Sequence, residues 1–457
     1  MKIKNVDILH GNLFKSIIIY SIPILLMGLV QKLFNAVDVM VLSVVADTRD
    51  VAAVGSSSTI IHLLIDTFFG ISTGARVVLA RLIGEGDEQK VARTTSTALY
   101  TSVIIGTITA VVGILLTPHF LIWTGCPTGP DGCFEQAIIY MRIYLFAAPF
   151  ILLYNYGSAI LSVSGDTQRP LYYMIASGLT NVILNFALCL ILPEKVAAVA
   201  IATAISQILG AVLVSVRIFR MDGPCHMSLG RLRWSGVAFG QIMRHGLPIG
   251  LVNALFPLSN LQIVAQVNSF GTAVMAGNAA INQLDGILSS IVAAPWSTAL
   301  TAFAGQNLGA KQNDRVKKSI VYCTAIAAFM ALTFVLIFTF FSEPLISLFT
   351  RDPDAIAAAQ IKSKYTMRLY LIPTLSSCVA RIIQVFGYPI LQTANSILTV
   401  FVFRFFWTQF IYASNPTLDV LFFCYAVSWS LTLLINIGIA TYLYQFRFKK
   451  GKLKKMG

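Results

Sequence analysis

The stretch that decides the fold is ARTTSTALYTSVIIGTITAVVGILLT, residues 92–117, in which Arg93 is the only charged side chain. A helix needs about 20 predominantly apolar residues to cross the roughly 30 Å hydrocarbon core of a bilayer, and this run is long enough. Strands of a membrane barrel would be only about 10 residues long and would alternate in polarity. The run therefore predicts a transmembrane α-helix.

Similar apolar runs lie along the rest of the chain. They fall near residues 15–45, 53–80, 136–162, 169–193, 195–219, 240–268, 275–302, 316–341, 365–389, 391–413 and 417–444. Hydrophobic residues make up 56% of the 457 residues and charged residues 11%, whereas a soluble domain carries about 25% charged residues. The sequence predicts an all-α integral membrane protein with twelve transmembrane helices.

The positive charge lies mostly in alternate loops. With twelve spans both termini lie on one side, and roughly 22 Lys and Arg residues fall on that side against about 7 on the other. Most lie in 447–455, beside Arg231 and Arg233, and in the loop with Lys311 and Arg315. Since cytoplasmic loops are rich in Lys and Arg, we expect a multi-pass cell-membrane protein with both termini in the cytoplasm. A nucleic-acid-binding protein would gather these charges in one patch.

The seven cysteines show no metal-ligand spacing. Cys126 and Cys133 fall in a loop that we expect on the outer side of the membrane. A disulfide and two free thiols are both compatible with that position.

The two halves of the sequence align with each other at an offset of about 225 residues. Pro23 aligns with Pro248, and the loop IGEGDEQKV (83–91) aligns with LGAKQNDRV (308–316). Because each half holds six spans, the repeats share one orientation, as in transporters that rock two bundles around a central cavity. Chance similarity between glycine-rich loops is the competing interpretation. The expected parts are a six-helix lobe (1–220), a basic cytoplasmic linker (221–245), a second six-helix lobe related by pseudo-two-fold symmetry (246–446) and a basic cytoplasmic tail (447–457).

Three carboxylates fall inside the predicted spans, at Asp38, Asp66 and Asp285. A charge near the bilayer centre costs about 2.5–3.5 kcal/mol on insertion scales, so such a residue usually has a function. Gln31, Asn35 and Asp38 are spaced at i, i+4 and i+7, so they share one helix face that favours lining a cavity. A carboxyl there can take up a proton, or hold Na⁺ together with neighbouring oxygens. A carboxylate at a helix end, or one paired with a nearby lysine, is the structural alternative.

The sequence resembles the multidrug and toxic compound extrusion (MATE) family. The resemblance rests on QKLFNAVD (31–38) after Pro23, GISTGA (70–75) before the IGEGD loop, YNY (154–156) with SGDTQRP (164–170), VAIATAISQ (199–207), GLP (246–248) and GQNLGA (305–310). It covers most of residues 15–320 and is looser afterwards. It implies a twelve-helix, two-lobe exporter of cationic or amphipathic organic compounds, driven by uptake of H⁺ or Na⁺.

The resemblance also implies a coupling-ion site in the first lobe. Carried onto this chain, its positions are Asp38, Asn155, Asn181, Asn185 and Thr203, beside Gln31 and Asn35, with Na⁺ held at Asp38, Asn181 and Thr203. The family pattern usually has an Asp where this chain has Asn185, and the missing negative charge favours H⁺ over Na⁺. Pro23 is expected either to bend the first helix when Asp38 is protonated or to be an ordinary membrane proline.

Other charges inside the predicted spans have two interpretations each. His62 and Asp66 are spaced at i, i+4, so Asp66 either supplies a missing negative charge to the cavity or forms a polar pair between helices. Asp285 either faces substrate in the second lobe or has a structural role. Arg381 and Arg404 are expected to snorkel or pair rather than to bind substrate.

Other functional classes find less support. Five scattered histidines form no catalytic cluster and no Gly-Lys-Ser/Thr loop is present, so we expect neither an enzyme nor a cofactor besides the coupling ion. A channel would show a repeated pore motif. The remaining alternative is a lipid-linked saccharide flippase of the same superfamily, which would need several basic residues in its cavity; the early helices offer Lys32 and Arg76. The expected partners are small, often cationic, organic substrates and membrane lipids, with the monomer as the functional form.

Overall fold

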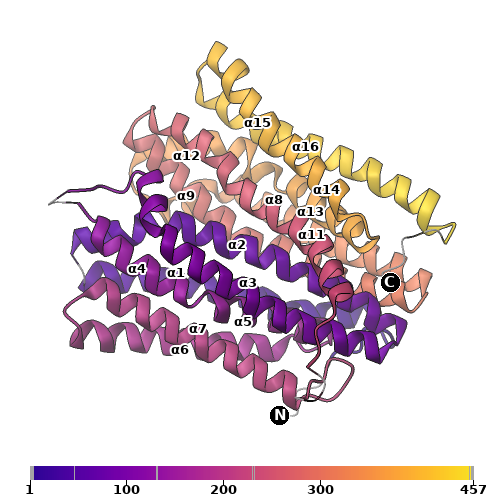
Figure 1. The fold of residues 1–457 in the computed structure, drawn as a ribbon. Coiled ribbons are helices and arrows are strands. Elements are labelled where there is room, and N and C mark those ends of the chain that lie inside the picture. Colours follow the sequence, from indigo (N-terminus) through magenta and orange to yellow (C-terminus); the bar gives the residue numbers. More distant parts are fainter. Residues whose placement is uncertain are drawn as a thin grey trace. The chain divides into compact units, whose positions relative to one another are not determined.

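The computed structural model describes residues 5–45, 47–129, 132–228, 230, 232–451 and 453, and the described part of the chain contains helices and no strands (Figure 1). The chain divides into two compact units. The first unit is Met1–Asp7 with Leu26–Gly250, and the second unit is Ile8–Leu25 with Leu251–Gly457. Two helices, α1 (Leu13–Val45) and α8 (Gly236–Asn268), therefore contribute residues to both units. The lobe boundaries expected from the sequence stay a prediction.

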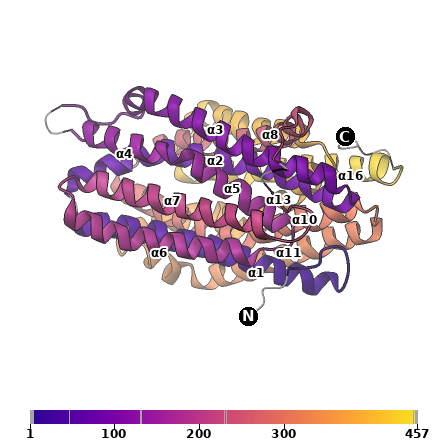
Figure 2. The same ribbon diagram turned by 60° about the horizontal axis from the view of Figure 1, so that its bottom comes forward.

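The first unit contains six further helices. They are α2 (Thr48–Glu85), α3 (Glu88–Trp123), α4 (Phe134–Phe146), α5 (Ala148–Val163), α6 (Gln168–Ile191) and α7 (Lys195–Arg220). The two helices α6 and α7 pack along each other, and they lie side by side in both views (Figure 1, Figure 2). This pairing places the polar residues of α6 beside those of α7.

The second unit contains the remaining helices. They are α9 (Thr272–Leu288), η2 (Ser289–Ala293), α10 (Ala294–Gly309), α11 (Asn313–Ser347), α12 (Pro353–Tyr365), η3 (Met367–Leu369), α13 (Leu371–Val385), α14 (Pro389–Ser396), η4 (Ile397–Val402), α15 (Phe403–Phe406), η5 (Trp407–Tyr412), α16 (Leu418–Leu443) and η6 (Tyr444–Phe448). Short π-helical segments connect several of these elements, so α9 to α10 and α14 to η5 are each nearly continuous rods.

The described helices confirm the predicted all-α membrane fold. Ten of them are long and apolar enough to cross a membrane, and up to eleven spans are present if the bent pair α4 and α5 counts as one. The tenth predicted span, 365–389, contains η3 and α13, and it is preceded by a helix, α12 (Pro353–Tyr365), that the sequence did not predict. Charged residues such as Lys362 and Lys364 lower the hydropathy of α12, so an apolar window does not detect it.

Two glycine pairs hold α8 against α2 within the first unit. Gly70 and Gly74 on α2, and Gly246 and Gly250 on α8, are each spaced at i, i+4 and face each other at the contact. A Cβ atom built on Gly74 would lie 2.4 Å from the Gly246 nitrogen, and one built on Gly246 would lie 2.4 Å from the Ile71 carbonyl oxygen. Small residues at this spacing let membrane helices approach backbone to backbone.

The loops aligned by the sequence repeat have the same backbone conformation. Gly86, which ends α2, has φ of +72°, and Lys311, its aligned partner after α10, has φ of +58°. The following residues, Asp87 and Gln312, are the N-caps of α3 and α11. The Asp87 carboxylate accepts a hydrogen bond from the Lys90 backbone N–H, which holds the pKa of Asp87 below its ordinary value. The repeat therefore extends to the local geometry of these loops.

Arg315 ties an early segment of the chain to the start of α11 within the second unit. Its guanidinium donates to the Asn307 side-chain oxygen (3.0 Å) and to the carbonyls of Gly11 (3.1 Å), Ile8 (3.3 Å) and His10 (3.4 Å). Asn307 is fully buried, and its amide also donates to the Ile8 carbonyl. The GQNLGA motif thus positions the Ile8–Gly11 segment.

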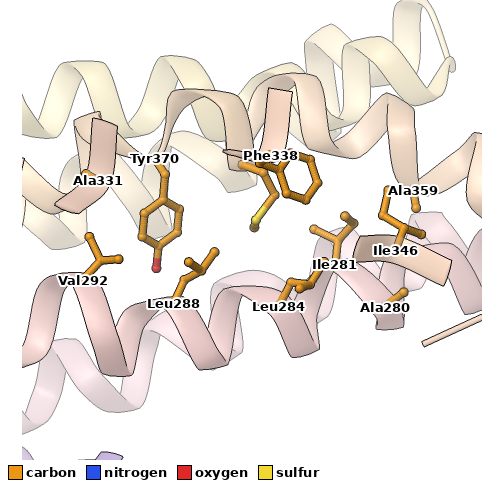
Figure 3. Close-up of a cluster of buried hydrophobic side chains, with 11 residues drawn as sticks. Ala280, Ile281, Leu284, Leu288, Val292, Ala331, Phe338, Ile346, Ala359 and Tyr370 are labelled. Atoms are coloured by element: carbon orange, nitrogen blue, oxygen red, sulfur yellow. The ribbon is translucent and has the colours of Figure 1, made fainter. Parts of the chain in front are cut away.

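The helix α9 has two different faces. Its apolar face lies in a buried cluster with residues of α11, α12 and η3: Ala280, Ile281, Leu284, Leu288, Val292, Ala331, Phe338, Ile346, Ala359, Met367 and Tyr370 (Figure 3). Its polar residues Asn278, Asn282 and Asp285 are spaced at i, i+4 and i+7, so they share another face of the same helix. Since α9 packs along α12, this polar face lies beside α12.

The Cys126 and Cys133 thiols lie close together beyond the end of α3. Their sulfur atoms are 3.7 Å apart and both thiols are free. Burial raises the pKa of the Cys126 thiol, which disfavours its reactive thiolate form.

Candidate functional site

Two buried asparagines and a half-buried threonine form a chain of amide and hydroxyl groups that joins α6 to α7 in the first unit. Asn185 donates from Nδ2 to the Asn181 Oδ1 (3.2 Å), and Asn181 donates from Nδ2 to the Thr203 Oγ1 (3.2 Å). Thr203 donates in turn to the Val199 carbonyl (2.9 Å). Asn185 is fully buried, and burying such groups is costly unless they are hydrogen-bonded to one another. The structure therefore brings together three of the residues predicted for the coupling-ion site.

The other predicted site residues lie on neighbouring helices or outside the described side chains. Asn35, Asp38 and His62 lie outside the residues whose side chains the structure describes. Gln31 is exposed on α1, and Asn155 is half-buried on α5. Their assignment to one site stays a prediction.

Two further predicted residues lie elsewhere in α1 and α2. Asp66 is exposed on α2 and takes part in a polar or electrostatic interaction. Pro23 is buried inside α1, in the part of that helix that belongs to the second unit.

A pocket in the second unit has a different chemical character. It is lined by Phe256, Asn260, Ile281, Asn282, Asp285, Lys362, Thr366, Met367, Tyr425 and Trp429, and the free space between these side chains is small, ≈ 30 Å³. These residues come from α8, α9, α12, η3 and α16, all on the second-unit side of the chain division. Asp285, which the sequence singled out, lies in the wall of this pocket.

Lys362 is the cation of the pocket wall. Its side chain is buried with 3% exposure. The ammonium donates to the Asn278 Oδ1 (2.7 Å) and the Asn282 Oδ1 (2.5 Å), both from the polar face of α9. It also lies over the rings of Phe422 (5.8 Å) and Tyr425 (5.7 Å). Neutral amides and aromatic faces thus surround a buried positive charge.

Arg404 lies one layer behind the same wall. It is fully buried, so of the two roles predicted for it, snorkelling or pairing, its burial excludes snorkelling. Its guanidinium donates to the Asn260 Oδ1 (2.9 Å) and the Ser428 Oγ (3.2 Å), and it lies 4.3 Å from the centroid of the Tyr425 ring. The Tyr425 hydroxyl donates to the same Asn260 oxygen (3.3 Å). Asn260 and Tyr425 therefore connect Arg404 to the pocket. Arg381, the other late arginine, is half-buried and donates to the Gln384 side chain (2.8 Å).

The pocket is electrostatically unbalanced towards positive charge. Lys362 lines it and Arg404 contacts its lining, while Asp285 is the one carboxylate among the lining residues. Asp285 is near enough to Lys362 to interact with it electrostatically. Among the described residues, no group of three or more His, Cys, Asp and Glu side chains is placed to hold a metal ion. The arrangement can attract and orient an anionic group, or balance one internal carboxylate.

Lys362 was missed in the sequence although a signal for it exists. Ala355, Ala358, Ala359 and Lys362 are spaced at i, i+3, i+4 and i+7, and all four are buried. A lysine in register with three alanines lies on the packed face of its helix. Because hydropathy alone does not indicate the helix α12, the spacing of these four residues is not conspicuous in the sequence.

Comparison with known proteins agrees with this architecture. The pattern of the MatE family matches residues 23–187 and 248–408, two stretches that begin at the prolines aligned by the repeat. The chain is 24% identical to the probable multidrug resistance protein YoeA of Bacillus subtilis, over 97% of this chain and 96% of that protein. It is 27% identical to the FAD transporter of Shewanella oneidensis, over 68% of each chain. The fold matches a solved structure of MATE in the bent conformation with a TM-score of 0.89 at 20% identity, over 99% of this chain and 100% of that one. The chain therefore belongs to the MatE family of membrane transporters.

Proposed function

We propose that the protein is a secondary antiporter that exports small amphipathic organic compounds across the cell membrane in exchange for H⁺. The two units alternate access to the substrate by rocking, and the chain works as a monomer. The multidrug resistance name of the relative YoeA supports this class of substrate, and cationic compounds are the first to test.

The observation that supports the coupling step is the hydrogen-bonded chain of Asn181, Asn185 and Thr203. The family resemblance assigns these three residues to a coupling-ion site, and they contact one another across α6 and α7. The buried residue at the end of this chain is a neutral asparagine, so Asp38 is the carboxylate left for coupling in this group of predicted residues. A single carboxylate can be neutralised by one proton, whereas Na⁺ is usually held by several oxygen ligands that include charged ones. We therefore propose H⁺ rather than Na⁺ as the coupling ion.

The test is efflux of rhodamine 123, a fluorescent organic cation, from proteoliposomes under an imposed proton gradient or an imposed Na⁺ gradient. We expect efflux under the proton gradient and its loss in Asp38→Asn, because an amide cannot take up and release the coupling proton. Asn268→Ala, at the last residue of α8, is the control substitution of a polar side chain, and we expect it to leave efflux unchanged. Efflux that is equal in Asp38→Asn and wild type would contradict the proposed coupling residue.

A second candidate function is movement of an anionic amphiphile, such as a lipid-linked saccharide. The observation that favours it is the buried pair of cations, Lys362 and Arg404, in the second unit. The relative named an FAD transporter is compatible with an anionic substrate, since FAD carries a pyrophosphate. Export of cations and movement of anionic lipids predict opposite preferences for the charge of the substrate.

A further inference from the structure

We propose that the pocket of the second unit binds the carboxylate or phosphate group of an amphipathic organic anion, with Lys362 as the contacting cation. The inference rests on the second candidate function given above, the movement of an anionic amphiphile, and names the residues of this chain that would hold its anionic group. Asn282, Asp285 and Lys362 form the polar part of the pocket wall, and Arg404 acts on it from behind.

The first argument for an anion site is the charge balance of the buried groups. Among the described residues, two buried cations, Lys362 in the lining and Arg404 behind it, stand against one lining carboxylate, Asp285, which leaves one positive charge. The amides that accept hydrogen bonds from Lys362 and Arg404 stabilise these charges without neutralising them. A ligand with one negative charge would complete the balance, whereas an organic cation would be repelled.

The second argument for an anion site is the hydrogen-bonding capacity of the two cations. A lysine ammonium has three N–H donors, and the two recorded hydrogen bonds of Lys362 use two of them. The third donor is available to an oxygen of a ligand in the pocket. On Arg404, Nη2 is buried and has no hydrogen-bond partner among the described residues. Because Arg404 does not line the pocket, we assign it a positioning role through Asn260 and Tyr425.

The third argument concerns the apolar part of the pocket wall. Phe256, Ile281, Met367, Tyr425 and Trp429 surround the polar groups. Ligand pockets commonly combine such an apolar surface with a few convergent polar groups that fix orientation. The free space of ≈ 30 Å³ suits the anionic group of a ligand, and the apolar side chains suit an aromatic or aliphatic body beside that group.

The first experiment measures binding to the detergent-solubilised full chain by fluorescence anisotropy. Fluorescein is the anionic probe and rhodamine 123, which shares its xanthene core, is the cationic probe. We expect tighter binding of fluorescein, and at least a roughly tenfold loss of fluorescein affinity in Lys362→Met, since a charge-assisted hydrogen bond is lost. Equal or tighter binding of rhodamine 123 by the wild type would overturn the inference.

A charge-balanced set of variants separates ligand binding from misfolding. Asp285→Asn raises the net positive charge of the pocket, so we expect severalfold tighter fluorescein binding. The double variant Lys362→Met with Asp285→Asn keeps the net charge and should recover part of the affinity lost in Lys362→Met. Arg381→Met removes a cation of the same unit outside the lining and should leave binding unchanged. If Lys362→Met and Asp285→Asn both folded and bound fluorescein like the wild type, the pocket would be purely structural.

A transport experiment distinguishes the two sources of the anionic group. Phosphatidylcholine proteoliposomes are loaded with fluorescein, or contain nitrobenzoxadiazole-labelled phosphatidylglycerol whose movement between leaflets is followed by dithionite quenching. A loss of fluorescein movement in Lys362→Met identifies a soluble organic anion, and a loss of lipid movement identifies a lipid headgroup. Transport of rhodamine 123 without binding of fluorescein would overturn this inference and leave the proposed export function standing. Binding of fluorescein without transport of any probe would support the pocket and contradict the export function.

Discussion

In the proposed coupling site, Asn185 is the residue whose missing negative charge favours H⁺ over Na⁺. It is fully buried and hydrogen-bonded to Asn181, whose amide reaches Thr203. Asn185→Asp would place a carboxylate beside two neutral oxygen ligands, a combination suited to a hard cation. We expect Na⁺ to raise the melting temperature of this variant by a few degrees, measured in NaCl against choline chloride, and to leave the wild type unchanged.

The matched control for that experiment is Asn436→Asp on α16. Asn436 is also fully buried and hydrogen-bonded to another asparagine, Asn395. A carboxylate there tests whether any buried charge next to an amide gains from Na⁺. Sodium stabilisation of the wild type itself would show that a neutral Asn185 is sufficient for a sodium site.

Single residues also show what the sequence could not reveal. Asp285 could be picked out because a carboxylate in an apolar run is conspicuous by itself. The meaning of Lys362 depends on Asn278 and Asn282, which are about 80 residues away along the chain and come next to it only when α12 packs on α9. Such a pairing has no local signature.

At the scale of elements, the crossing of α2 and α8 depends on four glycines. We expect Gly246→Val to destabilise the protein by about 3 kcal/mol or more, because the new side chain would meet the backbone of α2 rather than a movable side chain. The measurement is the melting temperature and the monodisperse fraction of the purified protein in detergent.

Gly240→Val is the control on the same helix. No described atom lies within 4 Å of the position that its Cβ would occupy. Its effect should therefore be limited to the small difference in helix propensity. If both valine variants melted alike, close backbone contact at Gly246 would not explain the stability of this crossing.

Helices were predictable wherever hydropathy alone identifies them. The runs near 92–117 and 316–341 lie inside α3 and α11. The helix α12 was not predicted from hydropathy, because it packs through small alanines and a buried lysine rather than through a long apolar run. The bend between α4 and α5 was also not predicted, since both helices share one apolar run near 136–162.

At the scale of the whole molecule, the loop charges predict the sidedness of the chain. Asn313, in the basic loop after α10, and Asn415, before α16, are both exposed. With the termini in the cytoplasm, a membrane-impermeant maleimide added to intact cells should label Asn415→Cys and not Asn313→Cys. All seven native cysteines are buried, so their background reaction should be low. Labelling of Asn313→Cys alone would invert the topology.

The repeat was the part of the whole architecture that the sequence predicted best. Pro23 and Pro248 mark the starts of the two stretches that match the family pattern, and Gly86 and Lys311 share a left-handed backbone. The membership of α1 and α8 in both units was not predictable, because a hydropathy pattern gives the length of a helix and not its neighbours.

The division of α1 has a consequence for the time course of synthesis. The segment Ile8–Leu25 belongs to a unit whose other residues begin only at Leu251. At roughly 5–20 residues per second, a ribosome needs on the order of 10–50 s to make the intervening chain. During that interval the carbonyls of the Ile8–Gly11 segment lack the hydrogen bonds that Arg315 donates in the folded protein. The first half of α1 likewise lacks its final neighbours. Biogenesis of this protein is therefore set by a delay between its earliest and its latest segments, which a slower or interrupted ribosome would lengthen.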